Sequence, residues 1–151
     1  MLASVTSDAP DAFAPGQGWR GSTLLGMRIA AVLSVVLGLG FGIPCAIGIW
    51  YLARHGGVWM FLGFPTYGGG PFATAGIDTT VALMVGFLVV CLAEVVAGWL
   101  LWTQPTVGAW MALAILPVEL LFWIGFALPY GVVLGLVRTV VVLVALLLEA
   151  R

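Results

Sequence analysis

The chain has 151 residues, of which 63% are hydrophobic and only 7% are charged. A soluble domain carries about 25% charged residues, so the expected solvent of this chain is a lipid bilayer rather than water. The formal net charge is −1 and there is no basic stripe, which excludes the usual pattern of a nucleic-acid-binding protein.

Residues 1–22 contain Pro, Gly and Asp and are interpreted as a mobile N-terminal tail. They lack the positive start and the continuous apolar core of a signal peptide, so we expect no cleavable segment here. Residues 23–151 are then predicted to form one transmembrane domain.

Four apolar segments are long enough to cross about 30 Å of hydrocarbon at a rise of about 1.5 Å per residue. These segments cover approximately residues 29–52, 81–102, 109–128 and 131–148. The last three are joined by short connections, which makes them antiparallel neighbours. The sequence therefore predicts an all-α membrane protein with four transmembrane helices in an up-down bundle.

The long connection at residues 55–76 is rich in glycine and aromatic residues and nearly uncharged. A disordered linker would be more polar, so we expect this loop to lie in the membrane interface or over one mouth of the bundle. Its functional candidates are His55, Trp59 and Tyr67. The single histidine is interpreted as an interfacial residue, because the chain has few partners for a metal site.

The placement of arginine predicts the orientation in the cell membrane. With four spans both termini lie on one side, which carries Arg20, Arg28 and Arg151, whereas the other side has Arg54. The positive-inside rule then places both termini in the cytoplasm.

Small residues recur at every fourth position of the first helix, at Ser34, Gly38, Gly42 and Ala46. Such a small-residue stripe lets another helix backbone approach closely. We interpret it as packing within one bundle, with contact to a second chain as the alternative.

Two cysteines, Cys45 and Cys91, fall inside apolar runs. Free cysteine is among the most buried residue types, so both are interpreted as small buried hydrophobic residues. The alternative is a redox pair between the first two helices, which no Cys-x-x-Cys spacing supports.

Three charges, Glu94, Glu119 and Arg138, interrupt the apolar helices. A charge at a helix centre costs at least about 2.5 kcal/mol on insertion scales, so such residues normally face the bundle interior and pair. Equal depth on adjacent helices predicts an ion pair between Glu119 and Arg138. The nearest candidate cation for Glu94 is Arg28, which could extend toward it from the start of the first helix. Without a cation, Glu94 would be protonated and neutral.

These charges have two interpretations. They either fix the helix register, or they line a polar cavity that binds a ligand or relays protons, with Glu94, Glu119, Arg138 and Arg28 as candidates. A quinone headgroup, an organic cation or a proton path would each suit two acids and one guanidinium. The sequence has no catalytic triad, phosphate-binding loop or metalloprotease motif, so we expect no catalytic residue, metal or bound cofactor.

One pattern of residues extends from the first helix to the third. It consists of a basic helix start, a Gly-Phe-Pro element and a second helix with Glu, then Gly, then a leucine-rich end. The matching positions are Arg28, Gly63 to Pro65, Glu94, Gly98, and Leu100 to Leu101. Over about residues 28–127 the chain resembles the DoxX-like family of small four-helix membrane proteins. The resemblance implies a membrane subunit linked to redox chemistry, similar to a subunit of thiosulfate:quinone oxidoreductase, with no chemistry of its own.

Three functions are compatible with the sequence. The first is an accessory subunit of a membrane redox complex, with a membrane protein partner and a quinone as candidate ligand. The second is a small oligomeric transporter or channel-like bundle in which Glu94 is the coupling carboxylate. The third is an interaction protein that contacts its partner, or a second copy, through the small-residue stripe.

Overall fold

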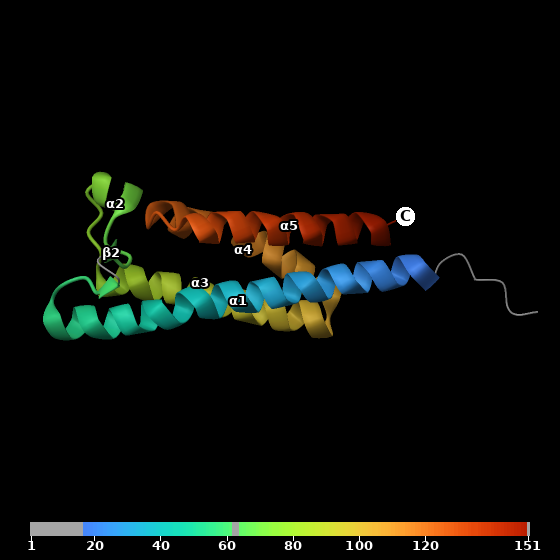
Figure 1. Ribbon diagram of the computed structural model, residues 1–151, viewed down its shortest axis with the longest axis horizontal. Helices are drawn as coiled ribbons and strands as arrows, with labels where there is room; N and C mark the ends of the chain where they lie inside the picture. The colour runs from blue at the N-terminus through green and yellow to red at the C-terminus, as the bar shows by residue number, and fades with distance from the viewer. Residues whose placement is uncertain (1–16, 62–63, 151) are drawn as a thin grey trace, which may run out of the picture.

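The structure is a computed structural model that describes residues 17–61 and 64–150. Its four long helices are α1 (Gln17–His55), α3 (Val81–Thr103), α4 (Pro105–Gly125) and α5 (Pro129–Glu149), which lie along one common axis (Figure 1). Between α1 and α3 lie the short antiparallel strands β1 (Met60–Phe61) and β2 (Phe64–Pro65) and the short helix α2 (Gly70–Thr74).

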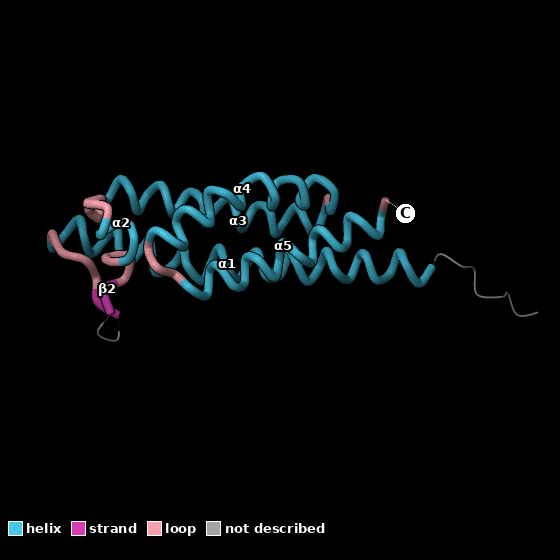
Figure 2. The backbone as a smooth tube through the Cα atoms, turned by 90° about the horizontal axis from the view of Figure 1, so that it is seen from above, coloured by secondary structure: helices cyan, strands magenta, loops and turns pink. Residues whose placement is uncertain are grey.

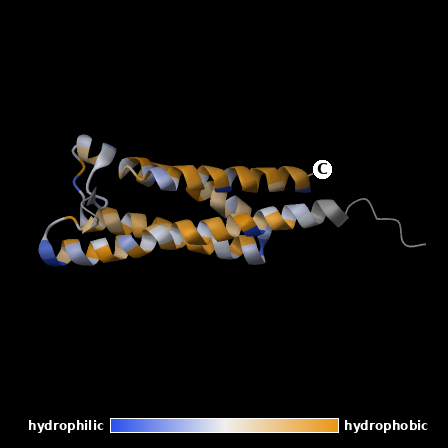
Figure 3. Cartoon of the chain, viewed as in Figure 1, coloured by the Kyte–Doolittle hydropathy of each residue, from blue (hydrophilic) through white to orange (hydrophobic). Residues whose placement is uncertain are grey.

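All four long helices are long and apolar enough to cross a membrane, which confirms the four predicted apolar helices. Their outward faces carry large hydrophobic side chains; Val89, Val133 and Leu147, for example, are 58%, 59% and 66% exposed. Figure 3 shows apolar residues along most of each long helix and hydrophilic ones at the end of α1 that leads into the loop. An apolar outer surface of this extent fits hydrocarbon rather than water.

The four long helices form a bundle in which α1 and α4 each pack against both α3 and α5 (Figure 2). Among the described residues, α3 and α5 make no backbone contact with each other, so they lie diagonally across the bundle. This diagonal arrangement determines which charged side chains can meet in the centre.

The small-residue stripe of α1 packs inside the bundle, as the first interpretation predicted. A Cβ added to Gly38 would lie 2.6 Å from the carbonyl oxygen of Cys91, and one added to Gly42 would lie 3.2 Å from the Cys91 Cβ. Ser34 is also buried, but Ala46 is exposed and does not continue the stripe. The alternative, a contact with a second chain through Gly38 and Gly42, is wrong because α3 already covers these residues.

The helix ends differ from the predicted ones at several places. Helix α1 ends at His55 rather than at 52, and helix α4 begins at Pro105 rather than at 109, because proline at the first turn lets the helix start directly after Gln104. The first helix begins at Gln17, so residues 17–22 of the expected tail are helical, and residues 1–16 lie outside the described part of the chain. Helix α4 ends at Gly125 rather than at 128, because the chain turns at Ala127, which has a φ of 55°. Helix α5 then begins at Pro129, where proline suits the first turn of a helix.

The loop between α1 and α3 is anchored on one end of the bundle. Tyr67 is only 3% exposed, and its hydroxyl donates a hydrogen bond of 2.8 Å to the carbonyl oxygen of Phe41. Burial raises the pKa of the Tyr67 phenol above its usual value. Phe72 of α2 packs so closely on α4 that a Cβ added to Gly125 would lie 2.2 Å from its ring. These contacts agree with the expected position over one mouth of the bundle.

Candidate functional site

A cluster of three charged side chains lies in the centre of the bundle. Glu94 comes from α3, Glu119 from α4 and Arg138 from α5, and their residues are 2%, 0% and 0% exposed. The cluster is bordered toward one end by alanines such as Ala112 and toward the other by aromatic residues such as Trp123. Three charges are therefore held in an apolar surrounding.

The predicted ion pair between Glu119 and Arg138 is confirmed. Arg138 donates from Nη2 to Glu119 Oε2 at 2.9 Å and from Nη1 to Glu119 Oε1 at 3.2 Å. This is the forked contact that suits a guanidinium and a carboxylate. Arg138 Nη2 also donates to the carbonyl oxygen of Ala112 at 3.3 Å.

The cation that binds Glu94 is Arg138, and the expectation that Arg28 approaches it is wrong. Arg138 Nη1 donates to Glu94 Oε1, so one guanidinium joins both carboxylates. The side chain reaches diagonally across the bundle from α5 to α3, which the length of arginine and its five N–H donors permit. The guanidinium of Arg28 instead lies over Trp102, with Cζ 5.3 Å from the ring centroid.

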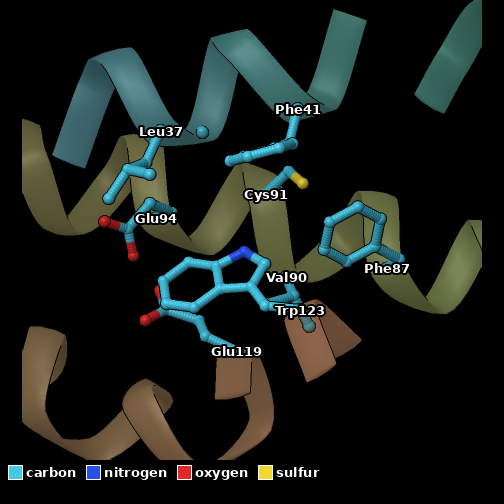
Figure 4. Close-up of a pocket in the computed structure, with 9 residues that line it drawn as sticks. Leu37, Phe41, Phe87, Val90, Cys91, Glu94, Glu119 and Trp123 are labelled. Atoms are coloured by element: carbon cyan, nitrogen blue, oxygen red, sulfur yellow. The ribbon is translucent and has the colours of Figure 1, made fainter. Parts of the chain in front are cut away.

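The cluster is nearly closed to other molecules. Within the described residues, two buried polar atoms of the cluster, Glu94 Oε2 and Arg138 Nε, have no hydrogen-bond partner, and neither has Ser34 Oγ on the neighbouring helix α1. Figure 4 shows Glu94 and Glu119 lining one pocket, with the Trp123 ring next to Glu119. This cavity has a volume of about 10 Å³, which is close to the minimum for one water molecule. A quinone ring or an organic cation does not fit there.

The loop candidates lie apart from these charges. His55 is exposed at the end of α1, where its ring stacks on Tyr51 at 4.3 Å between centroids and its Nδ1 lies 3.2 Å from the Tyr51 carbonyl oxygen. Trp59 is half-buried, and its carbonyl accepts a hydrogen bond from the backbone of Thr66. Tyr67 is part of the aromatic core against Phe87. In the described part of the chain, no three His, Cys, Asp or Glu residues are grouped to hold a metal ion.

The two cysteines are free and buried, as the first interpretation predicted. Cys45 donates from Sγ to the carbonyl oxygen of Met84 at 3.3 Å, and Cys91 lines the small cavity next to Glu94. Their surroundings are those of small hydrophobic side chains.

Sequence reasoning missed two members of the site. Ser34 appeared only as a small residue, although its hydroxyl is buried on the side of α1 that faces Glu94. Trp123 was not singled out, although it lines the cavity and packs on Gly135, where an added Cβ would lie 2.2 Å from the ring. The glycines of the fourth apolar segment were the available signal, because they leave room for a large neighbouring side chain.

Comparison with known proteins gives no match: no family model, no curated protein and no solved structure is similar to this chain. The resemblance to DoxX-like proteins therefore depends on the residues quoted above.

Proposed function

We propose that this chain is an accessory subunit of a membrane redox complex and contributes no catalytic residue of its own. Its four helices cross the cell membrane as an up-down bundle, with both termini on the cytoplasmic side that the positive-inside rule favours. The redox assignment comes from the resemblance to DoxX-like proteins, and the accessory role comes from the structure of the charge cluster.

The observation that supports the accessory role is the closed cluster of Glu94, Glu119 and Arg138. Its guanidinium is occupied by two carboxylates and a backbone carbonyl, and the adjoining cavity of about 10 Å³ excludes a substrate. Buried ion pairs of this kind can specify one arrangement of the surrounding elements. The cluster thus holds α3, α4 and α5 in register. Because its interior is closed, the chain would contact other molecules through the outer faces of its helices.

The outer faces suit contact with other membrane components. Trp99, Trp102 and Trp110 are 61%, 55% and 64% exposed, and all three lie near the connection between α3 and α4. Exposed tryptophan is typical of the membrane interface and is enriched in protein contacts. Of the three, Trp110 of α4 is the side chain that we assign to contact with a partner subunit in the same membrane.

The test is purification of the tagged full-length chain from its native membranes in a mild detergent, followed by mass spectrometry of the copurifying proteins and lipids. We expect an oxidoreductase subunit in constant ratio to the chain, with any quinone bound to the complex and not to the isolated chain. Trp110→Ala should reduce the ratio more than Val133→Ala, which changes an exposed residue of α5. Purification with no oxidoreductase would contradict the proposal.

A second candidate function, proton-coupled transport, is favoured by one observation. Two carboxylates share a single guanidinium, and Glu94 Oε2 has no partner within the described residues. A net charge of −1 is costly in this apolar site, and one bound proton would remove it. Proton flux into liposomes that Glu94→Gln abolishes, and that Glu149→Gln at the exposed end of α5 leaves intact, would support transport. Flux that is absent, or unchanged in both variants, rejects it.

A further inference from the structure

A groove of about 390 Å³ lies on the outer surface where α1 and α3 pack together. Valines of α1, among them Val32 and Val36, form one wall, and Trp99 and Trp102 of α3 form the other. At Gly98 the two helices are so close that an added Cβ would lie 2.8 Å from the carbonyl oxygen of Ala31. The volume falls in the range of about 300–1,000 Å³ that is usual for small-molecule sites. All residues that line this groove are apolar.

A positive charge stands at one end of the groove. Arg28 lies one helical turn before Val32, and therefore on the same face of α1. Its guanidinium lies over Trp102, at 5.3 Å from the ring centroid, and Trp102 is itself part of the groove wall. Within the described part of the chain, Arg28 forms no ion pair. The groove thus combines a hydrocarbon-like interior with an uncompensated cation at its end.

We propose that this groove binds one anionic phospholipid, with an acyl chain between α1 and α3 and the phosphate on Arg28. The guanidinium is suited to a phosphate because its N–H groups form a forked contact. Arginine and tryptophan both favour the headgroup region of a bilayer, which is where the phosphate of a lipid lies. A partner helix would fill the apolar groove but would leave Arg28 without an anion. The charge at the end of the groove therefore favours the lipid.

The matched control is at the other end of the same helix. Arg54 lies over Trp50 at 5.7 Å, in the same kind of cation–π contact, and neither residue lines the groove. Any general attraction of arginine to anionic lipid affects both sites equally. A difference in lipid retention between the Arg28 and Arg54 variants therefore reports on the groove beside Arg28.

The experiment is native mass spectrometry of the full-length chain in detergent, titrated with phosphatidylglycerol or with phosphatidylcholine of the same chain length. We expect one phosphatidylglycerol to be retained in preference to phosphatidylcholine. Arg28→Gln should weaken retention about fivefold, the effect of losing one arginine contact at an anionic lipid, and Arg54→Gln should leave it unchanged. Val32→Trp should block the groove, whereas Val140→Trp on the exposed face of α5 should not. Circular dichroism checks that every variant is folded.

The proposal would be overturned if the two lipids were retained equally, or if Arg28→Gln and Arg54→Gln weakened the retention of phosphatidylglycerol equally. It would also be overturned if Val32→Trp still retained the lipid, or if another molecule occupied the groove. A dimer that Val32→Trp converts to a monomer would assign the groove to a second copy of the chain. A quinone retained at the same site, and lost in Val32→Trp, would assign it to a neutral ligand.

Discussion

Replacement of Arg138 by leucine tests whether one guanidinium supports the centre of the bundle. The change removes the hydrogen bonds to Glu94, Glu119 and the carbonyl oxygen of Ala112, and leaves two carboxylates in a site that is at most 2% exposed. Removal of one partner from a buried ion pair costs about 3–5 kcal/mol. Because two carboxylates lose their cation here, we expect the loss of unfolding free energy to lie at the upper end of that range.

The assay is equilibrium unfolding in mixed micelles, in which an increasing fraction of denaturing detergent is followed by circular dichroism. The double variant Glu119→Leu, Arg138→Leu still contains an unpaired Glu94, so it should recover only part of the loss. The triple variant, with Glu94→Leu added, should recover most of it, because apolar replacement of a whole buried ion cluster is often neutral or stabilising. Arg54→Leu at an exposed position should change the free energy by less than about 0.5 kcal/mol.

The contact across the diagonal makes this series decisive. If the double variant is as stable as the triple variant, Glu94 does not depend on Arg138. If Arg138→Leu costs less than about 1 kcal/mol, the cluster does not hold the helices in register, and the structural role assigned to it is wrong.

Two further predictions concern packing and pH. Gly38→Leu should lower the unfolding free energy by about 1–3 kcal/mol or more, because its Cβ would lie 2.6 Å from the Cys91 carbonyl oxygen. The control is Gly40→Leu, whose Cβ would have no neighbouring atom within 4 Å, so it should be tolerated in the same micelle assay. Equal stability of the two variants would contradict the packing of α1 on α3. Burial raises the pKa of Tyr67, so its contribution to stability is complete below the unfolded pKa of about 10 and is lost as the pH rises above it. Between about pH 9 and 11, the unfolding free energy should fall less with pH for Tyr67→Phe than for the unchanged chain. An equal fall of the unfolding free energy in both proteins would refute this.

Apolar length and helical rise predicted much of this fold. The second predicted span, 81–102, agrees with α3 within one residue, because the apolar run there has clear ends at Thr80 and at Gln104. The pair between Glu119 and Arg138 followed from equal depth on neighbouring helices. These properties depend on local sequence and on short connections, which a single sequence contains.

The remaining features depend on contacts between distant segments. The bond from Arg138 to Glu94 was missed because depth and chain order point to neighbouring helices, whereas the long arginine side chain crosses the bundle. The burial of Tyr67 could not be foreseen, because a glycine-rich loop has no periodicity that shows which side chain turns inward. The helical state of residues 17–22 was missed because two glycines and the polar Gln17, Arg20 and Ser22 in this segment indicate a tail.

The position of Arg138 in the last helix has a consequence for the biosynthesis of the protein. Chains are made from the N-terminus, so both acidic residues of the cluster are synthesised before their cation exists. Until α5 joins the bundle, Glu94 and Glu119 have only water, protons or headgroups to compensate them. Completion of the bundle is thereby linked to completion of the chain, because a nascent chain that stops before Pro129 lacks Arg138, the cation that pairs with both acids.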